Sequence, residues 1–197
     1  MIVRDNEIQQ LVDALAVAIG SASKKYEKTT SGAAFVFSAL RTIEKQCDDA
    51  GQSNFPALEF LPAAVRSAQS GAALISALAG SLEVVASRLR WFQRLEPDMP
   101  DFVNGHANAH IIGPRGLEIR DDVVIGVTVM KPGLIYPNHQ HPPDEMYVAL
   151  SNGEWWQEGG AWHSPGCGGL VYNPSNITHT MRSGSQPLLA IWCLWTT

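Results

Sequence analysis

Four residues between positions 139 and 147 carry side chains that bind metal ions or move protons. They are His139, His141, Glu145 and Tyr147, in the segment HQHPPDEMY. Residues two apart on a β-strand face the same side, so each pair would share a face. Pro142-Pro143 predicts a turn that would place the two pairs on adjoining strands. Imidazole and carboxylate ligands together suit a divalent transition-metal ion such as Zn²⁺, Fe²⁺, Mn²⁺ or Ni²⁺.

Tyr147 indicates how such an ion could be used. An ordinary tyrosine has a pKa of about 10 and is a poor base at neutral pH. A divalent cation nearby favours the phenolate and lowers that pKa. A phenolate beside a Lewis acid suits removal of a proton from the carbon next to a carboxylate. A tyrosine that only packs in a barrel core is the alternative, and the spacing alone leaves both open.

The strands that would position these residues follow a helical region. Apolar residues recur at helical spacing from Ile8 to Ile19 and predict a helix that ends at Gly20. Further helices are predicted over Ser31–Cys47, over Asn54–Gly80 with breaks at Pro56, Pro62 and Gly71, and over Ser81–Phe92. No histidine precedes His106. The helical region is therefore expected to cover the barrel or form an interface rather than to carry chemistry.

From about residue 99, short β-branched and aromatic runs alternate with Gly, Pro and Asn, which is typical of a β-barrel or sandwich. Asn152-Gly153 and Gly159-Gly160 predict hairpin turns. His106 and His110 are expected in a loop before the barrel, and His163 on the surface. The chain is thus predicted to be mainly β, with an α-helical part over residues 1–98 and a β-barrel over residues 99–197.

Composition excludes several classes of protein. The chain has 197 residues and a net charge of −5, which argues against a nucleic-acid partner. No stretch reaches the roughly 20 apolar residues that span a membrane, and the acidic N-terminal segment does not resemble a signal peptide. Three widely spaced cysteines, Cys47, Cys167 and Cys193, predict no disulfide framework. A cytoplasmic protein without a membrane or nucleic-acid partner is expected.

Two segments resemble the signature motifs of the cupins, which are small double-stranded β-helix (jelly-roll) barrels. The first motif, G(X)5HXH(X)3–4E(X)6G, matches Gly133 to Gly153 with one extra residue before the last glycine. The second, G(X)5PXG(X)2H(X)3N, matches Gly168 to Ser183, with Asn176 in place of glycine and Ser183 in place of asparagine. Asparagine tolerates the left-handed backbone that a turn glycine supplies, so Asn176 is compatible with the motif.

The resemblance implies a metal site and an oligomeric state. In metal-binding cupins, three histidines and a glutamate of the two motifs point into the barrel. By position these residues are His139, His141, Glu145 and His179. One bound divalent transition-metal ion is implied, either Zn²⁺ or Fe²⁺, with Mn²⁺ and Ni²⁺ as alternatives. Cupins often pair through their sheet edges, which makes a homodimer the expected assembly.

Within the cupins, the helical N-terminal part and the HQHPPDEMY segment resemble the dimethylsulfoniopropionate lyases of marine bacteria, of the DddQ type. These enzymes cleave dimethylsulfoniopropionate to dimethyl sulfide and acrylate by β-elimination. The resemblance implies that His141, Glu145 and His179 bind the metal ion, that Tyr147 acts as ligand and then as base, and that Tyr136 assists substrate binding or proton transfer. His139 is implied either as a further ligand or as a residue behind the ligands.

The implied substrate is a small sulfonium carboxylate. A sulfonium is a permanent cation without hydrogen-bond donors, so aromatic faces are expected to hold it. The candidates are Tyr136, Trp155, Trp156, Trp162, Trp192 and Trp195. Two other functions use the same metal ligands: a cupin dioxygenase that consumes O₂, and a non-catalytic cupin that binds a small ligand. Tyr147 has an evident role only in the elimination.

Overall fold

The computed structural model describes residues 3–22, 27–47, 51 and 54–196. Its helices are α1 (Asn6–Ala22), α2 (Glu27–Ala39), the 3-10 helix η2 (Pro56–Phe60), α3 (Leu61–Gln69), α4 (Ala73–Ala86) and α5 (Pro100–Gly105). Its strands are β1 (Lys45–Gln46), β2 (Trp91–Phe92), β3 (His106–Ile112), β4 (Glu118–Ile119), β5 (Val123–Met130), β6 (Asp144–Ala149), β7 (Gly153–Gln157), β8 (Leu170–Asn173), β9 (His179–Ser183) and β10 (Leu188–Trp195).

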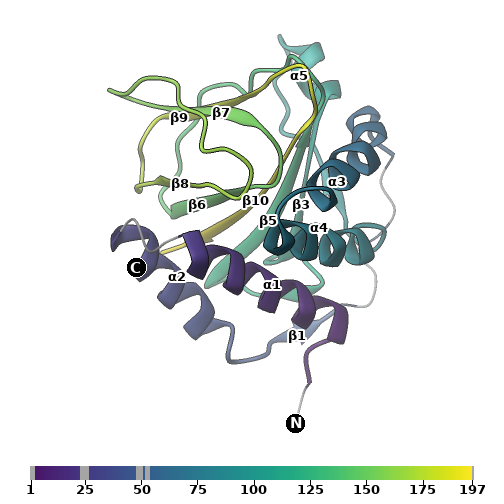
Figure 1. Ribbon diagram of the computed structural model, residues 1–197, viewed down its shortest axis with the longest axis vertical. Helices are drawn as coiled ribbons and strands as arrows, with labels where there is room; N and C mark the ends of the chain where they lie inside the picture. Colours follow the sequence, from purple (N-terminus) through teal and green to yellow (C-terminus); the bar gives the residue numbers. More distant parts are fainter. Residues whose placement is uncertain (1–2, 23–26, 48–50, 52–53, 197) are drawn as a thin grey trace.

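The strands form two sheets that enclose a barrel. The larger sheet has the order β1-β4-β3-β5-β10-β6-β8, with β2 on β3, and the smaller sheet pairs β7 with β9. The segment before β6 extends the smaller sheet, because bridges join Ile135 to Arg182 and His139 to His179. Figure 1 shows β7 and β9 on one side of the larger sheet and helices α1 to α4 on the other.

Both faces of the central strands are buried. On β10, Leu189, Ile191 and Cys193 pack in the core shared with the helices, whereas Ala190 and Trp192 pack inside the barrel. Alternate residues of a strand face opposite sides, so a strand covered on both faces has apolar residues at nearly every position. The few polar residues on the inner face of β3, β5 and β6 are therefore exceptions that require a local explanation.

Helix α1 forms as its periodicity predicts, although it ends at Ala22 rather than at Gly20. Its buried residues Ile8, Leu11, Leu15 and Ile19 recur every three or four positions and face the core. Asp5 caps its first turn by accepting hydrogen bonds from the backbone N–H groups of residues 7 and 8. The helix thus covers the outer face of the sheet and leaves the inner face for chemistry.

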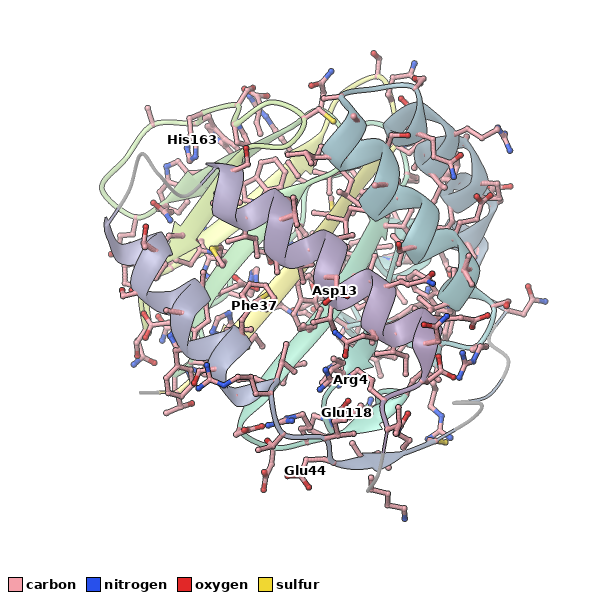
Figure 2. All side chains as sticks on the ribbon, turned by 60° about the horizontal axis from the view of Figure 1, so that its bottom comes forward. Arg4, Asp13, Phe37, Glu44, Glu118 and His163 are labelled. Carbon is pink, nitrogen blue, oxygen red and sulfur yellow. The ribbon has the colours of Figure 1, made fainter. Side chains whose placement is uncertain are left out.

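A buried ion-pair cluster joins the N-terminal segment to β4. Glu118 accepts hydrogen bonds from Arg4 at 2.6 Å and from Arg120 at 3.1 Å, and all three side chains are nearly inaccessible. Figure 2 shows Arg4 and Glu118 close together at one end of the helical layer. Burial by itself raises the pKa of Glu118, but the hydrogen bonds from the two arginines outweigh it and lower that pKa.

The same arginines explain why the helix predicted over Ser31–Cys47 is wrong beyond Ala39. Arg4 binds the carbonyls of Leu40 and Thr42, and Arg120 binds those of Ala39 and Thr42. Guanidinium groups therefore bind the carbonyl of Ala39, the last residue of α2, and those of Leu40 and Thr42 just after it, so these carbonyls do not depend on a further helical turn. The chain continues as an extended segment and forms β1.

Other local predictions are also wrong. Asn152-Gly153 is not a hairpin turn, because β6 and β7 belong to different sheets. Ser81 does not begin a helix, because α4 continues through Gly80; its apolar face, including Leu78 and Leu82, is buried on both sides of that glycine. Burial of this face offsets the cost of about 1 kcal/mol for glycine in a helix. Trp91-Phe92 forms strand β2, and His106 and His110 lie on β3 rather than in a loop.

The boundary predicted at residues 98 and 99 stays a prediction. Strands β1 and β2 belong to the N-terminal part, and they pair with β4 and β3 of the barrel sheet. Among the described residues, no helix combines the length and apolar character needed to cross a membrane.

Candidate metal centre

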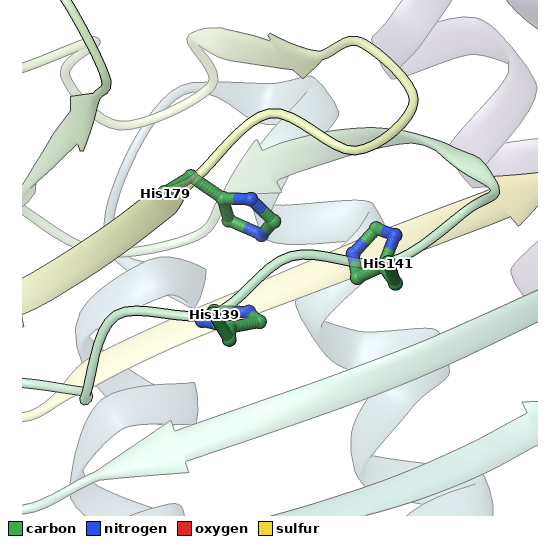
Figure 3. Close-up of side chains that lie close together, drawn as sticks. All are labelled: His139, His141 and His179. Carbon is green, nitrogen blue, oxygen red and sulfur yellow. The ribbon is translucent and has the colours of Figure 1, made fainter.

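Three histidines from both cupin-like segments converge inside the barrel. One ring nitrogen from each of His139, His141 and His179 lies within 4.8 Å of the others, and Figure 3 shows the three rings turned toward a common point. His139 and His179 also exchange backbone hydrogen bonds of 3.1 and 2.9 Å. His139 and His141 lie in an irregular segment rather than on the regular strand that their spacing predicts. The bridge between His139 and His179 nevertheless ties this segment to β9.

The turn at Asn176 holds His141 in place. Asn176 has a left-handed φ of 59°, and its backbone N–H donates to the carbonyl of His141 at 2.9 Å. Asparagine is one of the few residues besides glycine that adopt this conformation readily. The substitution in the second cupin-like segment therefore preserves the turn.

Each of the three rings uses one nitrogen to bind a backbone carbonyl. Nδ1 of His139, His141 and His179 lies 3.1, 2.9 and 2.9 Å from the carbonyl oxygens of residues 137, 143 and 177. A carbonyl only accepts hydrogen bonds, so Nδ1 carries the hydrogen in all three rings. Nε2 is then the nitrogen available as a ligand. Such carbonyl bonds are the usual way in which proteins orient metal-binding histidines.

Glu145 supplies a carboxylate to the same point. Its Oε2 lies 3.1 Å from Nε2 of His179 and 3.5 Å from Nε2 of His141. Asn173, its partner across strands β6 and β8, donates to Oε2 at 2.8 Å, and Gln157 donates to Asn173 at 2.6 Å. Burial by itself raises the pKa of Glu145, but the interactions with the neighbouring His141 and His179 outweigh it and lower the pKa to about 2. The carboxylate is therefore ionised at neutral pH.

This donor set fits a divalent transition-metal ion. Nε2 of His179 is buried and has no hydrogen-bond partner in the described part of the chain, although a carboxylate oxygen lies 3.1 Å away. Burial is the main cause that lowers the pKa of His139 to about 4, and the neighbouring His179 acts in the same direction. The His139 ring is therefore neutral and able to bind a metal ion. Neutral imidazoles and one carboxylate with converging lone pairs are typical ligands of Zn²⁺ or Fe²⁺.

A cavity of about 170 Å³ opens beside the cluster. Tyr147 lies on β6 two residues after Glu145 and is buried on the same face. Burial raises the pKa of Tyr147 well above the ordinary value, and the charge of Glu145 acts in the same direction. The lining residues are Phe92, Asn108, Thr128, Tyr136, His139, His141, Glu145, Tyr147, Met181, Trp192 and Leu194.

The structure separates the aromatic candidates. Tyr136 and Trp192 line the cavity. Trp155 is buried behind Tyr147, with ring centroids 6.0 Å apart. Trp195 packs against Gly32 in the core shared with the helices, and the half-buried Trp162 stacks on Arg182. Trp156 follows Trp155 on β7 and so faces the other side of that strand.

Two residues of the cavity lining, Asn108 and Thr128, belong to no sequence motif that predicts a site. Asn108 and Thr128 lie on the inner faces of β3 and β5 and bond to each other, with Thr128 donating to Asn108 at 2.6 Å. Their inward direction follows from the strand register. An isolated Asn or Thr in an apolar run was the only signal that could have identified them.

Comparison with known proteins places the chain in a family. A model of the dimethylsulfoniopropionate lyase family matches residues 28–190. The chain belongs to this family. It is 35% identical over 96 residues to dimethylsulfoniopropionate lyase DddQ of Ruegeria pomeroyi, which covers 48% of this chain and 47% of the relative. It is 27% identical over 123 residues to the DddL protein of Cereibacter sphaeroides, named as a putative lyase of this kind, which covers 62% of this chain and 52% of the relative. The matches span about half the length of both curated relatives.

Two solved structures share the fold over almost the whole chain. One belongs to a crystallographic study of the dimethylsulfoniopropionate lyases RdDddP and RnDddQII, with a TM-score of 0.72, 18% identity, and coverage of 97% of this chain and 93% of that one. The other is DddQ from Ruegeria pomeroyi, with a TM-score of 0.70, 22% identity, and coverage of 97% and 92%. The prediction of a mainly-β cupin barrel with an α-helical N-terminal part is confirmed.

Proposed function

We propose that this protein is a metal-dependent carbon–sulfur lyase that cleaves dimethylsulfoniopropionate to dimethyl sulfide and acrylate. One observation carries the proposal: a metal-type donor set, a buried tyrosine and an aromatic wall line the same small cavity. Each of the three corresponds to one part of the substrate, namely the carboxylate, the adjacent C–H bond and the sulfonium. Membership of the lyase family supports the same substrate.

The residues that would hold the metal ion are His141, Glu145 and His179, with His139 as a fourth donor. A divalent cation bound there supplies a Lewis acid, which withdraws charge from the substrate carboxylate and stabilises a nearby phenolate. Asn173 and the three backbone carbonyls keep the ligand atoms directed at one point. The ligand types accept either Zn²⁺ or Fe²⁺, and also Mn²⁺ or Ni²⁺.

Tyr147 is proposed as a ligand of the resting site and then as the base. Its phenolate takes a proton from the carbon next to the carboxylate. The electron pair of that C–H bond forms the carbon–carbon double bond, and the carbon–sulfur bond breaks with its electrons on sulfur. The products are neutral dimethyl sulfide, acrylate and a proton held on Tyr147. Because burial favours the neutral phenol, the base requires the cation beside it.

Trp192 and Tyr136 are proposed to hold the substrate. The sulfonium cation would lie against the Trp192 ring, because aromatic faces attract cations that carry only methyl groups. The Tyr136 ring lies beside His139, with centroids 4.9 Å apart, and lines the same cavity, so Tyr136 is proposed to assist substrate binding or proton transfer. The substrate is a small diffusible molecule. We further propose that the protein acts in the cytoplasm, since its three widely spaced cysteines suit a reducing compartment. We also propose that it is a homodimer, as cupins often pair through their sheet edges.

The test compares Tyr147→Phe with Tyr172→Phe in oxygen-free buffer. Tyr172 is the matched control because its hydroxyl binds Asp144, outside the cavity lining. Purified protein loaded with Zn²⁺ or Fe²⁺ receives dimethylsulfoniopropionate, and headspace dimethyl sulfide is measured together with bound metal. We expect wild type and Tyr172→Phe to release the gas, and Tyr147→Phe to lose at least about a hundredfold in rate.

Three outcomes would contradict the proposal in different ways. Full activity of Tyr147→Phe would exclude this residue as the base. Activity that appears only with O₂ would indicate a cupin dioxygenase. Tight binding of the substrate without release of dimethyl sulfide would indicate a non-catalytic binding protein.

A further inference from the structure

The Trp192 ring is held by two residues of β5, Gly126 and Thr128, which lie on the same face of the strand. Across the strands, Trp192 pairs with Gly126 on β5 and with Tyr147 on β6. Its indole Nε1 donates to the hydroxyl of Thr128 at 3.0 Å, and the residue is only 7% exposed. The ring is therefore fixed both at its polar edge and along its flat face.

A row of hydrogen bonds leads from Trp192 through Thr128 and Asn108 to Tyr136, and each residue donates to the next. An indole N–H can only donate, so the Thr128 hydroxyl accepts from Trp192. Thr128 then gives its own hydrogen to Oδ1 of Asn108 at 2.6 Å. The amide nitrogen of Asn108 is left to donate to the Tyr136 hydroxyl at 3.5 Å. One row of hydrogen bonds thus links Trp192 and Tyr136, two of the aromatic residues that line the cavity.

Gly126 provides the space for the indole. A Cβ atom at this position would lie 2.1 Å from Cζ2 and 2.3 Å from Cη2 of Trp192. These distances are far below van der Waals contact, so any side chain at 126 would displace the ring. The other cross-strand neighbour of Trp192 is Tyr147, and displacement in that direction would enter the cavity.

We propose that Thr128 and Gly126 are positioning residues that fix the Trp192 ring as a cation-binding wall, and so make the pocket prefer a carboxylate that carries a cationic group to one of the same shape without that group. The inference rests on the proposed function for the identity of the cation. Neither residue touches the reacting atoms in this account. Both act through the orientation of the indole.

A matched pair of ligands isolates the charge. 3-(Trimethylammonio)propionate carries a fixed methylated cation and cannot release dimethyl sulfide, and 4,4-dimethylpentanoate has the same shape with an uncharged tert-butyl group in place of that cation. Both are titrated calorimetrically into metal-loaded wild type, Thr128→Val, Thr128→Ser and Gly126→Ala. We expect wild type to bind 3-(trimethylammonio)propionate roughly tenfold more tightly than 4,4-dimethylpentanoate. Thr128→Val should reduce this ratio to about two, whereas Thr128→Ser keeps the hydroxyl and should retain it.

One further variant, Ser151→Ala, and the Gly126→Ala variant separate positioning from a loss of stability. Ser151→Ala is the control, because it removes a hydroxyl buried against Pro187 and Leu189, outside the cavity lining. It should lower the melting temperature and leave the ratio unchanged. Gly126→Ala perturbs the ring without touching the hydroxyl and should also lower the ratio, so the test survives if Thr128→Val does not fold.

The failure of this inference differs from that of the proposed function. Equal affinities of wild type for the two ligands, or a ratio in Thr128→Val and Gly126→Ala that matches wild type, would overturn it. If the ratio behaves as expected but wild type releases no dimethyl sulfide, the positioning role stands and the lyase proposal falls.

Discussion

His110 should make the folded protein sensitive to mild acid. It lies on β3 with its ring edge-on to Phe92 and Trp192, and its buried Nδ1 has no hydrogen-bond partner in the ranges that the structure describes. Burial lowers its pKa from 6.5 to about 4, and the positive charge of Arg115 acts in the same direction. A proton on this ring would therefore oppose folding.

The sign and size of the effect follow from the two pKa values. Between pH 6.5 and about 4, the unfolded chain binds a proton at His110 that the folded chain does not, so the free energy of unfolding falls as the pH falls. At about pH 5 the unfolded ring is almost fully protonated and the folded ring is mostly neutral. The difference corresponds to ~2 kcal/mol relative to about pH 7.5.

The assay is urea unfolding of wild type and His110→Asn at about pH 7.5 and pH 5. Asparagine does not titrate, and the three clustered histidines are common to both proteins, so their contribution cancels. Wild type should lose ~2 kcal/mol more than the variant between the two pH values. His163→Asn is the control, because His163 is exposed, and it should behave like wild type. Identical pH dependence of wild type and His110→Asn would refute the reasoning.

Three further predictions concern the ion-pair cluster and the metal site. Glu118→Gln should lower the free energy of unfolding by roughly 3 kcal/mol, because it leaves Arg4 and Arg120 buried without a counter-charge. Urea unfolding measures this difference. As a control, Glu154→Gln, in an exposed ion pair, should change the free energy of unfolding little. Asn173→Ala should weaken metal binding about 10- to 100-fold, because Asn173 orients Glu145; competition with a chromogenic chelator measures it, and Asn176→Gly should bind like wild type. Removing metal with a chelator should lower the melting temperature, and Zn²⁺ at about 100 times its dissociation constant should restore ~2.7 kcal/mol; an unchanged melting temperature would argue against the site.

The sequence was sufficient to predict which side chains converge, because the spacing of the two cupin-like motifs records them; that these side chains bind a metal ion stays a prediction. His139, His141, Glu145 and His179 converge although the segment of the first two is not a regular strand. Burial of both faces of β5, β6 and β10 by the helices and the smaller sheet explains the apolar runs that predicted a barrel. The spacing of residues in the motif predicts that these side chains converge even where the backbone does not form a regular strand.

Features that depend on contacts distant in sequence could not be predicted. The end of α2 is set by Arg120, which is 81 residues away from the carbonyl that it binds. Trp192 and Trp195 are both buried on β10, and only the register places the first in the cavity and the second against helix α2. The hydrogen bond from Trp192 to Thr128 spans 64 residues and carries no local signal.

The central claim is that the cavity beside the histidine cluster performs a metal-assisted elimination. The most direct test measures acrylate and dimethyl sulfide together as metal-loaded wild type consumes dimethylsulfoniopropionate under argon. The account predicts equal amounts of both products for each substrate molecule consumed, and no turnover after the metal is removed with a chelator. Absence of both products from the metal-loaded protein, or unchanged turnover after complete metal removal, would contradict it.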